Sequence, residues 1–129
     1  MCIRDSIRRN KIMNVEIFSN INETEKFNLL SRAKLYVLPS YVDGIPISFY
    51  EAWSKKAIVI TYYLPTYVDI KDYIIAAKVG DLEDLKEKII YALDNYDKLT
   101  VIADKALEYA MNHEFGKVIN ETCDEILKL

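Results

Sequence analysis

The chain has 129 residues, of which 51% are hydrophobic and 29% charged, and its formal net charge is −3 at pH 7. This size and apolar content predict one globular domain and exclude intrinsic disorder, while the acidic balance argues against nucleic acid as the main partner. No apolar run reaches the roughly 18 residues that a transmembrane helix needs. The two cysteines, Cys2 and Cys123, are too far apart in sequence for a metal motif, and they indicate a reducing compartment.

The first residues lack the apolar segment of a secretory signal peptide. Residues 1–6 resemble the translation of a sequencing-library adapter, so we expect residues 1–13 to be an adapter-derived or disordered leader. The domain would then span residues 14–129 and be incomplete at its amino end. This interpretation implies that the chain is a carboxy-terminal fragment of a longer protein.

The first predicted elements are a strand over 14–18, where polar and apolar residues alternate, and a helix that Asn22 caps. The apolar run 35–38 predicts a strand that is buried on both faces. A loop then leads to Pro46, which we place at the first position of a helix that ends near Lys55.

The second half of the chain continues this alternation of strands and helices. Residues 57–61 predict a second buried strand, 62–67 an aromatic loop, and 73–79 a weaker third strand. Asp81 caps an amphipathic helix, and helical periodicity continues, with one break, over 99–129. Strands that alternate with helices across short connections predict an α/β fold, with a Rossmann-like, mostly parallel sheet flanked by helices.

The loop between the 35–38 strand and the next helix is the candidate site, because ligands bind at the carboxyl ends of parallel strands. The free N–H groups at the start of that helix suit a phosphate, and Gly44 lets the backbone approach a ligand closely. Asp43 and Glu51 add two carboxylates, which are good acceptors for the vicinal hydroxyls of a sugar. A phosphate site beside two such carboxylates is typical of nucleotide-sugar binding.

The same segment resembles the signature of retaining glycosyltransferases of the GT-B fold, family 4 (glycosyl transferases group 1). In that signature a Pro-Ser pair precedes Glu-Gly, and a second Glu follows eight residues after the first. The matching residues in this chain are Pro39, Ser40, Asp43, Gly44, Glu51 and Ala52. The order of the predicted elements also matches over 14–129, so the resemblance implies the carboxy-terminal, donor-binding half of a GT-B enzyme.

The resemblance implies catalytic roles for two carboxylates: Asp43 would face the donor hexose, and Glu51 would bind the ribose hydroxyls of the nucleotide. It implies that the remaining donor-binding residues are Ser40, Gly44, Ile45, Pro46, Ile47 and Ser48. It implies no metal and no other cofactor, with an NDP-sugar as donor substrate. Positioning of the donor and stabilisation of the leaving diphosphate would then carry the reaction.

The chain departs from the family pattern at several positions. Asp43 is one methylene shorter than the usual Glu, Lys56 replaces a Gly, and Pro65-Thr66 replaces a Gly-Gly pair. The Arg/Lys pair that neutralises the diphosphate in this family, and the acceptor-binding domain, would lie upstream of the chain. We therefore expect the chain alone to be inactive.

For the full-length parent, the resemblance implies transfer of a hexose with retention to a glycan or lipid-linked acceptor, in the synthesis of cell-surface polysaccharide. We expect a cytoplasmic enzyme that associates peripherally with the inner face of the membrane. The alternative is a degenerate, non-catalytic α/β module that serves protein interactions, with which the changes at Lys56 and Pro65-Thr66 are compatible. Tyr62, Tyr63 and Tyr67 are weaker candidates for stacking on a base or a sugar.

Overall fold

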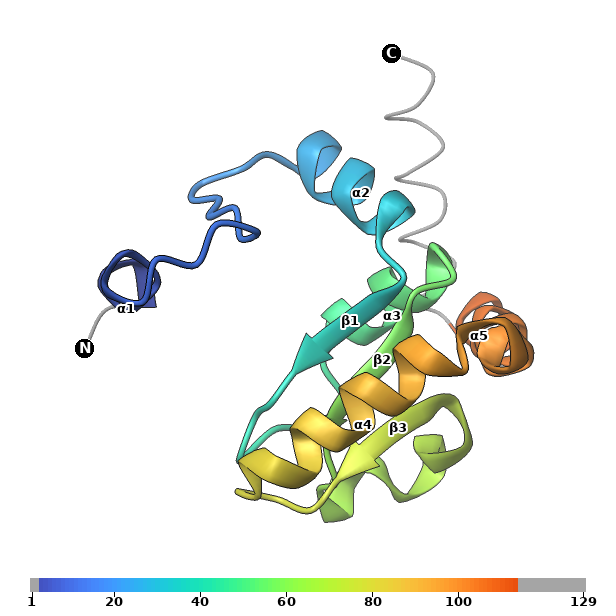
Figure 1. Ribbon diagram of the computed structural model, residues 1–129. Coiled ribbons are helices and arrows are strands. Elements are labelled where there is room, and N and C mark those ends of the chain that lie inside the picture. The colour runs from blue at the N-terminus through green and yellow to red at the C-terminus, as the bar shows by residue number, and fades with distance from the viewer. Residues whose placement is uncertain (1–2, 114–129) are drawn as a thin grey trace.

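A computed structural model describes residues 3–113 of the chain. Its centre is a parallel sheet of three strands in the order β1-β2-β3, formed by Leu35–Leu38, Ile58–Tyr62 and Ile74–Ala77 (Figure 1). Leu35 pairs with Ile58, and Val59 pairs with Ile74. The predicted α/β class with a parallel, Rossmann-like sheet is therefore confirmed.

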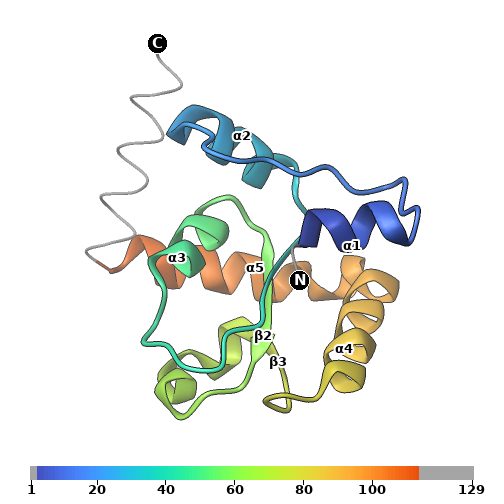
Figure 2. The ribbon, with the colours of Figure 1, turned by 90° about the vertical axis from the view of Figure 1, so that its left-hand side faces the viewer.

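Helices precede, connect and follow these strands. They are α1 (Ile3–Arg9), α2 (Glu23–Arg32), α3 (Ile47–Ser54), the 3₁₀ helix η1 (Pro65–Tyr73), α4 (Leu82–Asp94) and α5 (Tyr96–Met111). In Figure 2, α3 and α4 lie on opposite sides of β2. Among the described helices, none is long and apolar enough to span a membrane.

Two groups of buried side chains lie on the two faces of the sheet. The aromatic cluster packs beneath α3, η1 and part of α5, and it comprises Phe49, Tyr50, Ala52, Trp53, Ala57, Val59, Leu64, Tyr67, Ile70, Ile74, Ala106 and Ala110. The aliphatic cluster packs beneath α4 and the start of α5, and it comprises Ile58, Ile60, Tyr62, Ala77, Leu85, Ala92, Leu99 and Ala103. Successive residues of β2 and β3 enter opposite clusters, as the period of two in a strand requires.

The central strand β2 is buried along its whole length, as its apolar run predicts. The prediction that 35–38 is buried on both faces is wrong, because β1 is only partly covered and Val37 is 37% exposed. The physical reason is position: β1 is the outer strand of the described sheet, and α4 packs on β2 and β3 instead.

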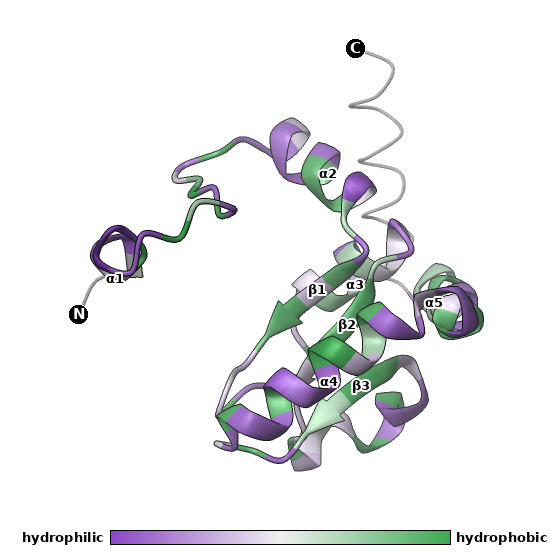
Figure 3. Cartoon of the chain, in the orientation of Figure 1, coloured by the Kyte–Doolittle hydropathy of each residue, from purple (hydrophilic) through white to green (hydrophobic). Residues whose placement is uncertain are grey.

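The predicted strand over 14–18 is also wrong, since these residues form neither a helix nor a strand and are exposed. An alternating pattern becomes a strand only where neighbouring backbone supplies hydrogen bonds, and no described strand pairs with this segment. In Figure 1 this segment and α1 stand away from the sheet. Figure 3 shows α1 as mostly hydrophilic.

Two predicted helix caps are confirmed. Asn22 Oδ1 accepts a hydrogen bond of 2.8 Å from the Glu25 N–H at the start of α2. Asp81 Oδ1 accepts one of 3.0 Å from the Asp84 N–H at the start of α4. Each bond satisfies an N–H group that has no acceptor inside its helix.

Other boundaries differ from expectation. Pro46 is the residue before α3, with φ −67° and ψ 142°, and not its first residue. The second part of the predicted 62–67 loop begins the 3₁₀ helix η1, and α5 begins at Tyr96 and not at residue 99. The predicted helix beyond the break near 112–116 lies outside the described residues.

Candidate functional site

The candidate site lies at the carboxyl ends of β1 and β2, where the loop 39–46 leaves β1 and enters α3. The loop is tied to η1, because Thr66 Oγ1 donates a 2.8 Å hydrogen bond to the backbone oxygen of Asp43. Near its start, the Ser40 N–H bonds the backbone oxygen of Leu38 at 3.0 Å.

A cavity of about 270 Å³ opens beside the hydrogen bond between Thr66 and Asp43. Its lining residues are Tyr41, Val42, Asp43, Leu64, Pro65 and Thr66. The structure therefore brings Asp43 next to the Pro65-Thr66 pair.

The start of α3 is open to solvent on one side. Pro46 offers no side-chain cap, and the Phe49 N–H bonds the backbone oxygen of Pro46 at 3.0 Å. The first two N–H groups, those of Ile47 and Ser48, have no acceptor within the helix. The Ile47 side chain is exposed. This end of α3 therefore has the free donors and the partial positive charge that bind a phosphate.

Two further loop residues have different surroundings. A Cβ added to Gly44 would meet no atom within 4 Å, so packing within the described chain does not require a glycine there. The open space leaves room for a ligand against the backbone. Ile45 packs on the aromatic cluster, which anchors the end of the loop to the core.

Glu51 lies on α3 and forms an ion pair with α2. Its Oε2 is 2.7 Å from Lys26 Nζ, and the side chain is only 12% exposed. Lys26 Nζ also lies 3.0 Å from Glu23 Oε1. Burial alone would lower the pKa of Lys26, but the interactions with the carboxylates of Glu51 and Glu23 together outweigh burial and raise the pKa above its usual value.

The two predicted carboxylates are held by different parts of the structure. Asp43 is half-buried on the loop and is fixed through its backbone by Thr66. Glu51 is fixed through its side chain by Lys26 of α2. Within residues 3–113, the two share no hydrogen-bond or ion-pair partner. They would therefore contact different parts of one elongated ligand.

Tyr67 lies in the core and not on the surface, where it could stack on a base or a sugar as the sequence suggests. Its ring is fully buried against Phe49, with ring centroids 5.4 Å apart, so neither face is free to stack on a ligand. Its hydroxyl is buried near the Thr61 side chain and makes no hydrogen bond of good geometry with the described residues. Burial, and then the nearby charge of Asp43, raise the pKa of this hydroxyl. Tyr62 is also buried, whereas Tyr63 is 40% exposed.

The contacts of Lys26 and Tyr67 with the site are not visible in the sequence. Lys26 lies far from Glu51 in the chain, and it looks like an ordinary charge on an amphipathic helix. The one usable signal was that Lys26 follows the first turn of a capped helix and directly precedes the buried Phe27.

Other candidate groups do not join the site. In the described part of the chain, no cluster of three or more His, Cys, Asp or Glu side chains is placed to hold a metal ion. His113 packs on Tyr109, with ring centroids 4.0 Å apart, and its Nδ1 lies 2.8 Å from the Tyr109 backbone oxygen.

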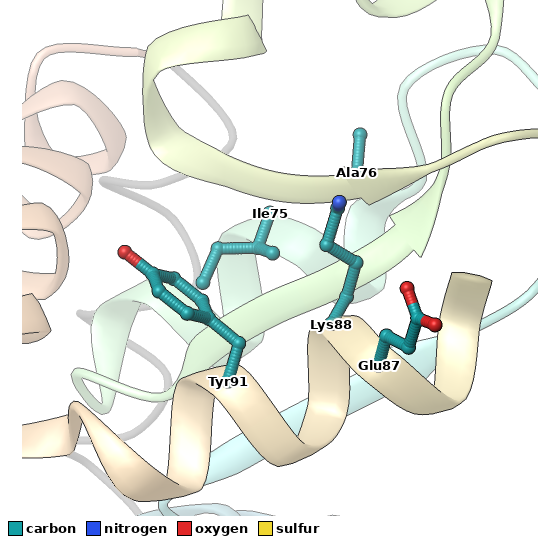
Figure 4. Close-up of a pocket in the computed structure, with 5 residues that line it drawn as sticks. All are labelled: Ile75, Ala76, Glu87, Lys88 and Tyr91. Carbon is teal, nitrogen blue, oxygen red and sulfur yellow. The ribbon is translucent and has the colours of Figure 1, made fainter. Parts of the chain in front are cut away.

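A second cavity, of about 370 Å³, lies between β3 and α4 (Figure 4). Its lining residues are Ile75, Ala76, Glu87, Lys88 and Tyr91. Lys88 Nζ pairs with Asp84 Oδ1 at 3.3 Å. The cavity therefore has an apolar floor and a paired lysine at its rim, and it shares no residue with the loop 39–46.

Comparison with known proteins places the site within a family. The family model described as Glycosyl transferases group 1 matches residues 4–109, which include the loop, α3 and every residue of the candidate site. A comparison with curated proteins finds no match.

Proposed function

The chain belongs to the glycosyl transferases group 1 family, and on this basis we propose that it binds the nucleotide-sugar donor of a hexosyltransferase. Members of this family transfer a sugar from a donor, so the family match favours a transferase over a non-catalytic interaction module.

The open start of α3 is the observation that carries the proposal. It lies at the carboxyl ends of β1 and β2, where parallel sheets bind their ligands. The free N–H groups of Ile47 and Ser48 would bind the diphosphate, whose charge the helix dipole favours. The same donors would stabilise the diphosphate as it leaves, when its negative charge increases.

The remaining site residues would surround the sugars. Asp43, at the rim of the 270 Å³ cavity, would accept hydrogen bonds from the donor hexose, with Ser40 and Gly44 beside it. Ile45 and Pro46 would fix the end of the loop. Glu51 would accept a hydrogen bond from the ribose of the nucleotide, and no metal or other cofactor is required in this scheme.

The complete reaction needs more than this site. We propose that a further domain of the parent protein supplies the acceptor site and the cationic residues that neutralise the diphosphate. The parent would transfer the hexose with retention to a glycan or lipid-linked acceptor in polysaccharide synthesis, at the inner face of the membrane. The chain by itself would bind the donor without transferring the sugar.

Equilibrium binding of UDP-, GDP- and ADP-sugars, measured by calorimetry, tests the proposal. We expect one nucleotide class to bind, and Asp43→Asn and Glu51→Gln each to weaken binding by about tenfold, since each removes a charged acceptor. Glu87→Gln, on α4 at the other cavity, is the matched control and should leave affinity unchanged. Equal affinity of all three variants, or no binding by the folded wild-type chain, would contradict the proposed site.

A further inference from the structure

The contact between α2 and α3 is built around one buried carboxylate oxygen. Glu51 Oε2 is shielded from solvent and accepts no hydrogen bond of good geometry from the described residues. Lys26 Nζ, 2.7 Å away, is the cation that offsets its charge in this part of the chain. An ionised oxygen that is taken out of water needs such a partner, because losing its hydration is costly.

The lysine is itself held in place. Glu23, one turn earlier on α2, binds the same ammonium group at 3.0 Å and is 62% exposed. Lys26 is 35% exposed, the neighbouring Phe27 is buried, and Leu30 of α2 packs against the aromatic cluster. The Lys26 side chain therefore lies between an outer and an inner carboxylate, with its position set by a packed helix.

We propose that Lys26 is a positioning residue for donor binding: by pairing with Oε2, it leaves the other oxygen of Glu51, Oε1, to accept from the nucleotide ribose. This inference rests on the proposed function, because it assigns a task to Glu51 within that site. A carboxylate has two oxygens, and fixing one of them also fixes the direction in which the other accepts. Holding the acceptor in advance reduces the ordering cost of binding.

Discrimination of the ribose hydroxyls tests this inference, because a purely structural ion pair would not affect it. Binding of UDP, GDP and ADP to the full chain is measured first. The nucleotide that binds is then compared with its 2′,3′-dideoxy form, which lacks the hydroxyls that Glu51 would bind. We expect the wild-type chain to prefer the ribonucleotide by about tenfold, the effect of one hydrogen bond to a charged group.

The variants separate positioning from packing. Lys26→Met keeps the length of the side chain and removes the charge, and it should lose most of the roughly tenfold preference. Lys26→Arg should retain the preference, since the guanidinium also pairs with a carboxylate. Glu25→Gln, at an exposed position of the same helix that forms no ion pair with Lys26, is the control and should keep it.

The inference and the proposed function fail in different ways. If Glu51→Gln loses the preference and Lys26→Met keeps it, the role of Lys26 is overturned while that of Glu51 stands. If Glu51→Gln also keeps the preference, the proposed role of Glu51 is overturned. Should Lys26→Met not fold, Lys26→Gln replaces it, and an unchanged preference in that variant overturns the inference.

Discussion

The two faces of the sheet are filled in different ways. Large rings contact one another in the aromatic cluster. The Trp53 ring, for example, contacts the rings of Phe49, Tyr50, Tyr73 and Tyr109 at centroid distances of 5.3 to 6.2 Å. The aliphatic cluster consists of Ile, Leu and Ala with one tyrosine, Tyr62. Ring contacts prefer particular angles, whereas aliphatic side chains chiefly need matching volume.

The candidate site is built on the aromatic face. α3, which carries Glu51, buries its aromatic side chains in that cluster, and Tyr67 lies beneath the loop that holds Asp43. Thr61, the buried polar residue of β2, also serves this side by donating a 2.8 Å hydrogen bond to the backbone oxygen of Leu38. The ring contacts of the aromatic cluster, which prefer particular angles, therefore lie on the face that carries the candidate site. The aliphatic cluster, whose packing depends chiefly on volume, lies on the other face.

The largest difference between the faces should appear when one core side chain is truncated on each. Trp53 is fully buried, and its Nε1 donates a 3.2 Å hydrogen bond to the Tyr73 backbone oxygen. Trp53→Ala should cost about 3–5 kcal/mol of unfolding free energy, measured by urea denaturation. Leu85→Ala, at a buried position of α4, should cost about 2–3 kcal/mol. An equal or larger cost for Leu85→Ala would contradict the contrast.

Alkaline pH should weaken the aromatic face in particular. Burial, followed by the nearby Tyr50, Tyr73 and Asp69, raises the pKa of Tyr109 from 10.0 to about 12. Since the unfolded chain ionises this phenol at lower pH than the folded chain, stability is fully present below pH 10 and falls as pH rises towards 12. Denaturation midpoints across this pH window measure the loss, which should be smaller in Tyr109→Phe. The same slope in both proteins would contradict the assignment.

A smaller effect should come from the buried hydroxyl of Tyr67. Because this group makes no hydrogen bond of good geometry with the described residues, Tyr67→Phe removes a desolvation cost and should stabilise the chain by about 1 kcal/mol. Tyr62→Phe is the control in the aliphatic cluster, because the Tyr62 hydroxyl is not a buried group without a partner, and it should not stabilise. Thermal unfolding measures both, and a destabilised Tyr67→Phe would show that this hydroxyl is satisfied.

The smallest expected effect concerns Lys56, just after α3. Its φ of +60° lies in the left-handed region, and the N–H groups of Lys56 and Ala57 bond back to the backbone oxygens of Trp53 and Ala52 at 3.0 Å. This helix ending favours glycine. Lys56→Gly should therefore stabilise the chain by up to about 1 kcal/mol, measured by urea denaturation, although it loses an exposed ion pair with Asp104. A loss of stability would contradict the strain at this position.

The sequence predicted what local rules determine. The caps at Asn22 and Asp81 and the buried strand at 57–61 follow from short patterns whose hydrogen bonds and burial lie close by in the chain. Pro46 was placed one position too far into α3 because proline fixes φ alone, and its ψ of 142° is what puts it outside the helix.

Features that depend on distant neighbours were not predictable in the same way. The alternating residues over 14–18 match a strand, but no described strand lies beside them. The candidate site shows the same limit: the motif indicates Asp43 and Glu51, whereas the partners of Glu51 and the burial of Tyr67 arise only from packing. The binding roles of the motif residues stay predictions.

The hydrogen bond from Thr66 to the Asp43 backbone has a consequence for how the sugar preference of such a site would evolve. It joins the segment after β2 to the segment after β1, so a substitution at position 66 would shift the Asp43 backbone even if the carboxylate itself were unchanged. Sugar preference could then drift through a residue outside the recognition motif. Sorting related chains by their motif alone would group together proteins whose loops hold the acidic residue differently.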